Sequence, residues 1–142
     1  VRMDLFAFHY DSKLSVSKLK RLAENPNVAP VSLTPGGSKR QDFGLASWRD
    51  EHILITGGFK GVALGLGGHL RSALTFDINN NKWSAKPDLK KDRAHHSSCV
   101  LKDKAFVFGG SKNHKTSRGT IEVLDLLSEH LGWELLATTL PQ

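Results

Sequence analysis

Three histidines, His95, His96 and His114, are the residues of this 142-residue chain best suited to binding a metal ion. Imidazole is the commonest metal ligand in proteins, and a site needs several ligands that converge on one point. Adjacent residues on a β-strand point to opposite faces, so His95 and His96 cannot both reach one ion without distortion. We therefore expect no metal site and no cofactor. His96 is expected to pack near the centre of the fold, and His114 to lie in a loop.

Cys99 is the single cysteine and the candidate nucleophile, with Ser97, Ser98 and two histidines close in sequence. Thiol catalysis needs an imidazole base in contact with the sulfur and a third group that orients the base. The sequence contains no pattern that supplies this third group. On an inner strand, Cys99 is better explained as a small buried apolar residue. No catalytic residue is therefore predicted in this chain.

Glycines are frequent, and phosphate binding is the chemistry that they suggest. The set comprises Gly57-Gly58, Gly109-Gly110, Gly61, Gly65, Gly67 and Gly68. A phosphate-binding loop of the Walker type ends in Gly-Lys-Ser or Gly-Lys-Thr and leads into a helix, so that backbone amides and the lysine reach the phosphates. Neither feature is present, because a predicted strand follows the glycines. We interpret them as structural.

Composition and charge exclude several classes of function. The chain is 39% hydrophobic and 24% charged, which is typical of a globular domain. No apolar run approaches the length of about 18 residues that a membrane-spanning helix needs. The formal net charge is +6, but the basic residues lie singly or in pairs in predicted loops, so nucleic-acid binding is not expected. A lone cysteine excludes an internal disulfide and favours a reducing compartment, for which we expect the cytoplasm.

A repeat organises the chain, and repeats of this length are typical of stacked or ring-like folds. Four landmarks recur in the same order. They are Arg40 and Arg93, 53 residues apart; Gly57-Gly58 and Gly109-Gly110, 52 apart; Phe76-Asp77 and Leu124-Asp125, 48 apart; and Trp83 and Trp133, 50 apart.

Each repeat is predicted to form four short strands, because short apolar and β-branched runs alternate with turn residues. In the first repeat we expect strands at Phe43–Trp48, His52–Thr56, Arg71–Asp77 and Lys82–Ala85. In the second we expect them at His96–Leu101, Lys104–Phe108, Thr120–Asp125 and Trp133–Ala137. Lys102-Asp103 and Asn79-Asn80-Asn81 are expected to form turns.

The first forty residues fit this repeat less well. Leu5–Tyr10 resembles a third strand and Lys13–Leu19 a fourth, although Leu14, Leu19 and Leu22 are equally compatible with a short helix. The stretch from Glu24 to Gly37 is rich in proline and glycine and is expected to be a long loop.

Taken together, the landmarks resemble the Kelch repeat. That family has an arginine before the first strand, a double glycine after the second, an aromatic-Asp pair at the end of the third and a tryptophan on the fourth. The resemblance implies an all-β protein of four-stranded antiparallel blades that form an incomplete β-propeller. Residues 1–39 would be a partial preceding blade and a loop, and residues 40–89 and 90–142 would each be one Kelch repeat. Propellers close with about four to eight blades, so the other blades are expected from missing sequence or from another chain.

The resemblance also implies a non-catalytic module that binds a protein or an acidic peptide, as an interaction scaffold or a substrate-recognition adaptor. The alternative is a fragment of a propeller enzyme whose catalytic residues lie outside this chain. The loop after strand two and the loop before strand one open on one face of the ring, and functional residues favour such loops. The candidate partner-binding residues there are Lys60, His69, Arg71, Lys90, Lys91, Arg93, Lys112, Asn113, His114, Lys115 and Arg118.

Overall fold

The structure, a computed structural model, describes residues 5–10, 14–19 and 31–32 as backbone, and residues 40–61, 68–80, 82–112 and 118–141 in full. The chain divides into two compact units, Val1–Arg40 and Gln41–Gln142. In the first unit, strands β1 (Leu5–Tyr10), β2 (Leu14–Leu19) and β3 (Val31–Ser32) form an antiparallel sheet in that order. Residues 14–19 are thus a strand and not a helix, and β3 interrupts the stretch that was expected to be a loop.

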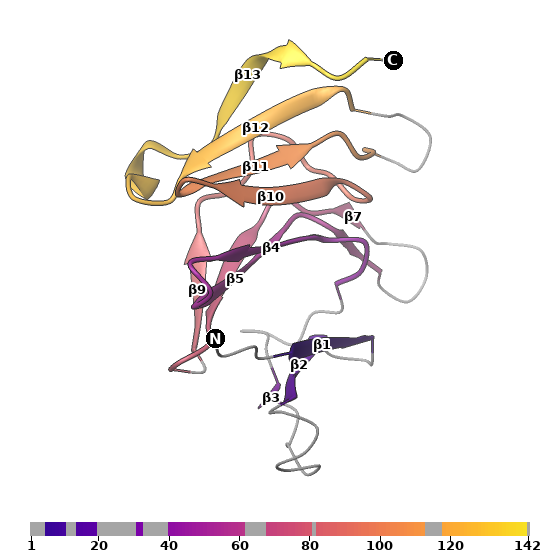
Figure 1. The fold of residues 1–142 in the computed structure, drawn as a ribbon. Coiled ribbons are helices and arrows are strands. Elements are labelled where there is room, and N and C mark those ends of the chain that lie inside the picture. Colours follow the sequence, from indigo (N-terminus) through magenta and orange to yellow (C-terminus); the bar gives the residue numbers. More distant parts are fainter. Residues whose placement is uncertain are drawn as a thin grey trace. The chain divides into compact units, whose positions relative to one another are not determined.

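The second unit contains two four-stranded antiparallel sheets (Figure 1). The first consists of β4 (Gly44–Trp48), β5 (His52–Thr56), β8 (Ala73–Asp77) and β9 (Lys82–Lys86). The second consists of β10 (Ser97–Leu101), β11 (Lys104–Phe108), β12 (Thr120–Asp125) and β13 (Glu134–Thr139). Their ends lie within two residues of the predicted ends. The all-β fold of four-stranded blades, open rather than closed into a ring, is therefore confirmed. We call the sheets blade 1 and blade 2.

Two short elements lie outside the two four-stranded sheets. A hairpin of β6 (Phe59–Lys60) and β7 (Gly68–His69) lies between β5 and β8, in a region where the sequence predicted only a loop. A 3₁₀-helix, η2 (Glu129–Leu131), lies between β12 and β13.

The recurring aspartate caps the turn that follows the third strand of each blade. Asp77 Oδ1 accepts hydrogen bonds of 2.9 Å from the backbone N–H groups of Asn79 and Asn80. Asp125 Oδ1 accepts the equivalent bond, also 2.9 Å, from Leu127. These bonds favour the charged form. The pKa of Asp77 is lowered mainly by the Asn80 side-chain amide, and the pKa of Asp125 mainly by the Leu127 backbone amide. The Asp landmark thus reflects a turn requirement.

The double glycines let the chain leave the second strand in a left-handed conformation, at a point where a neighbouring backbone approaches closely. Gly57 and Gly110 have φ angles of +53° and +87°. A Cβ on Gly57 would lie 2.5 Å from the carbonyl oxygen of Arg93, and one on Gly110 would lie 2.5 Å from that of Ala94. Both the left-handed backbone and the close approach therefore require glycine.

Blades 1 and 2 share a hydrophobic core at their seam. Leu54 and Ala73 of blade 1 pack with the buried side chains of blade 2, among them Val107, Leu124 and Trp133. Figure 1 shows the innermost strands, β4 and β10, side by side at this seam. Burial of apolar side chains from both blades is the main force that holds them together.

The other flank of blade 2 is open among the residues that the structure describes. Phe106 and Phe108 stack there with ring centroids 6.1 Å apart, and Leu101 is 62% exposed. Cys99, expected to be buried, is exposed. It is opposite Phe106 in the β10–β11 register and so lies on this flank. In blade 1 the position equivalent to Phe106 is Leu54, which blade 2 covers. The prediction for Cys99 was wrong, because no described residue covers this flank of blade 2.

Candidate partner-binding surface

One edge of the blades carries most of the predicted partner-binding residues. Strand direction alternates, so the loops after β5 and β11 open at the same end as the segment Pro87–His96, which joins β9 to β10. We call this end the loop edge, and Pro87–His96 the connector. The connector crosses the seam from the outer strand of blade 1 to the inner strand of blade 2.

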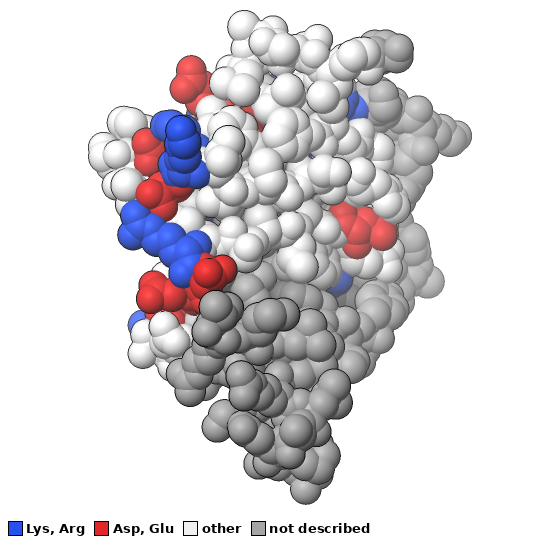
Figure 2. Space-filling view, viewed as in Figure 1, with Lys and Arg blue, Asp and Glu red and all other residues white. Residues whose placement is uncertain are grey.

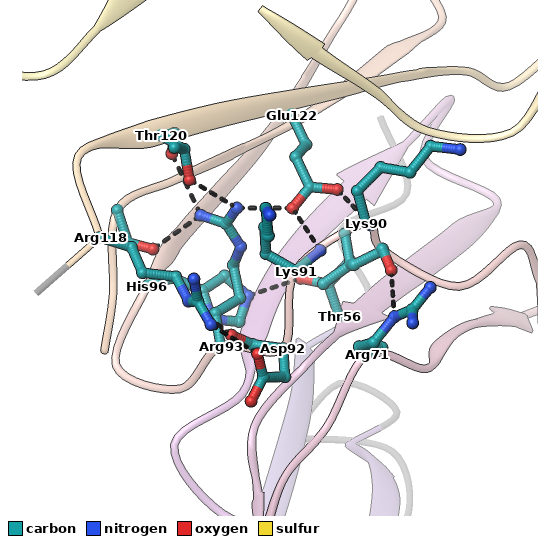
Figure 3. A network of polar contacts seen from close by, with 12 residues as sticks. Thr56, Arg71, Lys90, Lys91, Asp92, Arg93, His96, Arg118, Thr120 and Glu122 are labelled. Atoms are coloured by element: carbon teal, nitrogen blue, oxygen red, sulfur yellow. Dashed lines mark hydrogen bonds and ion pairs between the residues drawn. The ribbon is translucent and has the colours of Figure 1, made fainter. Parts of the chain in front are cut away.

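A buried carboxylate holds the connector against blade 2 (Figure 3). Glu122 on β12 is fully buried, and its two oxygens accept the backbone N–H groups of Lys90 at 2.6 Å and Lys91 at 3.1 Å. The Arg93 guanidinium, also fully buried, donates to the same carboxylate at 2.5 Å. Buried charges are stable only when they are paired and hydrogen-bonded, and this arrangement meets both conditions.

Arg93 also ties the connector to the loop after β11. Its Nη1 donates to the carbonyl oxygens of Gly109 at 2.7 Å and Thr120 at 3.1 Å, and its Nη2 donates to Thr120 Oγ1 at 3.1 Å. The guanidinium suits this task because it is planar and presents several donors in fixed directions. Arg93 was predicted as a partner-binding residue, and its position inside the blade gives it a structural role.

Two further arginines anchor the connector from either side. Arg71 of blade 1 donates its Nε–H to the carbonyl oxygen of Leu89 at 2.6 Å. Arg118 of blade 2 donates to the carbonyl oxygen of Asp92 at 2.9 Å and to its carboxylate at 2.5 Å. The connector is therefore fixed by both blades, and residues between the anchors are presented on a rigid backbone.

The exposed cations at the loop edge are Lys60, Arg71, Lys90, Lys91 and Lys112. In the described part of the chain, the ammonium groups of the four lysines form no ion pair, and Figure 3 shows the Lys90 side chain extended away from the carboxylate of Glu122. Asp42 and Asp88 are exposed acids of the same edge.

Of the remaining predicted residues, His69 is half-buried, and its ring packs edge-on against that of Phe59 with ring centroids 5.5 Å apart. Asn113, His114 and Lys115 lie outside the described residues.

At the opposite edge, where the β4–β5 and β10–β11 turns lie, Arg49 and Asp103 form an ion pair. Arg49 donates to both oxygens of Asp103 at 2.7 and 2.9 Å, and Trp48 Nε1 donates to the same carboxylate at 2.7 Å. These bonds, chiefly the one from Arg49, lower the pKa of Asp103. Figure 2 shows basic and acidic residues intermixed along this edge, on the left of the view. Because acidic and basic residues are intermixed along this edge, it attracts a charged partner less than a surface of one sign would.

His96 lies at the inner end of the seam, as the sequence predicted for a residue near the centre. It is 8% exposed, and its Nε2 is 2.9 Å from Thr56 Oγ1 of blade 1. Burial is the largest cause that lowers the pKa of His96 to about 4, and the nearby charge of Arg93 acts in the same direction. His96 is therefore neutral in the folded chain near neutral pH.

Because folded His96 is buried and neutral, we expect the free energy of unfolding to fall at low pH, where this histidine would have to bind a proton. The unfolded chain binds a proton near pH 6.5, whereas folded His96 binds one only near pH 4, so stability falls as the pH drops through that interval. Between pH 7 and pH 5 the loss from this residue should be about 2 kcal/mol. Urea unfolding of the wild-type chain and of His96→Gln at both pH values isolates the contribution. An equal pH dependence in the two proteins would contradict the prediction.

Sequence reasoning missed Glu122, the residue that organises the connector. The sequence nevertheless contains a pattern that could have indicated it. On β12, Glu122 shares a face with the core residue Leu124, so the alternation places a carboxylate where an apolar side chain is expected. A charged residue at a core-facing strand position indicates a buried partner.

Among the described residues, no group of three or more His, Cys, Asp or Glu residues is placed to hold a metal ion. No helix in the same part of the chain is long and apolar enough to cross a membrane.

The chain is similar to known proteins in sequence and in fold. The Kelch motif family matches residues 92–130. An F-box/kelch-repeat protein of Arabidopsis thaliana is 30% identical over 80 residues, which cover 56% of this chain and 22% of that protein. The solved structure of YjhT superimposes with a TM-score of 0.70 at 17% identity, over 89% of this chain and 46% of YjhT. The chain thus spans less than half the length of either protein.

Proposed function

We propose that this chain, in which the Kelch motif matches residues 92–130 and the sheets form an open β-propeller, is a non-catalytic protein-interaction module. In this proposal the loop edge binds an acidic peptide segment of a partner protein. Kelch repeats typically serve protein interaction, and loops on a rigid scaffold are the usual place for binding residues.

One observation supports the loop edge above all. Lys90 and Lys91 form no ion pair in the described part of the chain and project from a connector that both blades hold in place. Lys82 and Lys102 likewise form no ion pair among the described residues, but they lie beside the turns of the opposite edge. Lysines fixed on a rigid connector and free of internal partners can pair with carboxylates of a ligand, and such complementarity mainly gives specificity and fast association. Arg71 can contribute its remaining N–H donors in the same way.

The similarity to an F-box/kelch-repeat protein supports a finer proposal, a substrate-recognition adaptor. In that role the loop edge would select the protein that the adaptor delivers. The free, exposed thiol of Cys99 is compatible with a reducing compartment such as the cytoplasm.

The test is binding of a fluorescein-labelled peptide of alternating Glu and Gly, followed by fluorescence anisotropy. The double variant Lys90→Gln/Lys91→Gln should weaken binding about three- to tenfold at low salt, since an exposed charge pair contributes roughly 0.2–1 kcal/mol. The difference should shrink as salt is added, because exposed charges are screened.

The control removes the same charge from the opposite ends of the strands. Lys82→Gln/Lys102→Gln takes away two exposed lysines near the turns and should leave the affinity within about twofold of the wild type. A wild-type chain that does not bind the acidic peptide, or equal losses in the two double variants, would refute the proposed ligand surface.

A further inference from the structure

We propose that Glu122 is a positioning residue of the ligand surface, although it is fully buried and cannot touch the ligand. Its carboxylate fixes the backbone from which Lys90 and Lys91 project. This inference rests on the proposed function of the loop edge and adds the residue that orders it.

The geometry of the carboxylate carries the argument. Its two oxygens accept two consecutive backbone amides, Lys90 N at 2.6 Å and Lys91 N at 3.1 Å, and the second oxygen also accepts Arg93 Nη2. Hydrogen bonds to a charged acceptor are roughly twice as strong as neutral ones. Because two neighbouring peptide groups are held at once, the connector backbone is fixed at the two residues whose side chains are exposed.

Blade 1 shows that the fold itself does not require an acid at this position. Glu122 is opposite Val107 in the β11–β12 register, and Leu74 is opposite Ile55 in the β5–β8 register. Val107 and Ile55 are equivalent because each lies two residues before the double glycine. A leucine thus occupies the Glu122 position of blade 1. The carboxylate therefore serves a local purpose in blade 2, and the contacts that it makes are those of the connector.

Fixing the connector matters for affinity because lysine side chains and flexible loops lose conformational entropy when they bind. A backbone that is already ordered reduces this loss. Without the carboxylate, the amides of Lys90 and Lys91 lose their buried acceptor, and the segment between the Arg71 and Arg118 anchors becomes free to move. The two ammonium groups would then contribute less to binding.

The test is a double-mutant cycle that uses the same labelled Glu/Gly peptide. Glu122→Gln keeps the shape of the side chain and removes its charge. It should weaken peptide binding about three- to tenfold, and in its background Lys90→Gln/Lys91→Gln should cause less than about a twofold further loss. Lys60→Gln, on the β6–β7 hairpin, should cause the same loss in the wild-type and Glu122→Gln backgrounds.

Arg93→Gln is the matched control for simple destabilisation. Both single variants break the Arg93–Glu122 ion pair, but only Glu122→Gln removes the charged acceptor of the two amides. Amide hydrogen exchange at Lys90 and Lys91 should accelerate about tenfold or more in Glu122→Gln and much less in Arg93→Gln. Should Glu122→Gln fail to fold, Glu122→Asp, with a shorter carboxylate, takes its place in the cycle and in the exchange experiment.

The outcomes separate this inference from the proposed function. Suppose that the wild type binds the peptide and that Lys90→Gln/Lys91→Gln weakens binding. If this loss is the same in the wild-type and Glu122→Gln backgrounds, the positioning role is refuted and the ligand surface stands. If Arg93→Gln reproduces every effect of Glu122→Gln, Glu122 acts only through stability and the inference also fails. If the wild type does not bind the peptide, both are overturned.

Discussion

Replacement of Arg93 by methionine should lower the free energy of unfolding by about 3–5 kcal/mol, the typical loss when one partner of a buried ion pair is removed. The guanidinium is fully buried and donates hydrogen bonds to Gly109, Thr120 and Glu122. Methionine fills much of the volume but leaves a buried carboxylate without its cation and the carbonyl oxygen of Gly109 without the donor that Arg93 supplies. Urea unfolding followed by circular dichroism measures the loss.

Two variants show whether burial and pairing are the cause. Arg118→Met breaks the pair with Asp92, which is partly exposed, and should lower stability by no more than about 1 kcal/mol. The double variant Arg93→Met/Glu122→Leu should be less destabilised than the sum of its single variants, because it leaves no unpaired buried charge. Strict additivity, or a loss for Arg93→Met no larger than for Arg118→Met, would show that the ion pair is not coupled as the geometry implies.

Trp133→Ala should lower the free energy of unfolding by about 3–5 kcal/mol, as expected when a buried tryptophan is truncated. The indole is 1% exposed and packs in the core that the two blades share. Its Nε1–H donates to the carbonyl oxygen of Pro87 at 2.9 Å, so the same side chain also holds the start of the connector. Thermal and urea unfolding would both record the loss.

Trp83 is the natural comparison, since it occupies the equivalent position in blade 1. It is only half-buried and packs on Phe76 with ring centroids 5.1 Å apart. Trp83→Ala should therefore be at least about 1 kcal/mol less destabilising than Trp133→Ala, in line with the smaller apolar area that it buries. The reverse order would mean that the seam between blades 1 and 2 contributes less than its packing implies.

The sequence was sufficient to predict the blades because their rules are local. Each strand is a short run bounded by residues whose chemistry ends it, as Gly57 and Gly110 end the second strand by adopting a left-handed backbone. The aspartates at Asp77 and Asp125 are likewise explained by the turns that follow them. Landmarks of this kind need no knowledge of distant contacts, so pattern and spacing were enough.

The seam could not be predicted, because its bonds join residues far apart in sequence. Glu122 and Lys90 are 32 positions apart, and Arg49 and Asp103 are 54 apart. Arg93, which the sequence offered as a partner-binding residue or as a structural one, is buried and faces Glu122, 29 positions away. For the candidate site, the sequence predicted the lysines of the loop edge, but not the carboxylate beneath them. Their role in binding stays a prediction.

The connector has a consequence for anyone who engineers this chain. Its hydrogen bonds go forward to Glu122 and Arg118 and back to Arg71, so the joint between the sequence repeats is bonded to both blades. A graft that exchanged blade 2 for another at this joint would separate an acceptor from its donors. A splice point between β12 and β13 would leave those bonds intact, and the transferable module is the pair of blades with its joint in the middle.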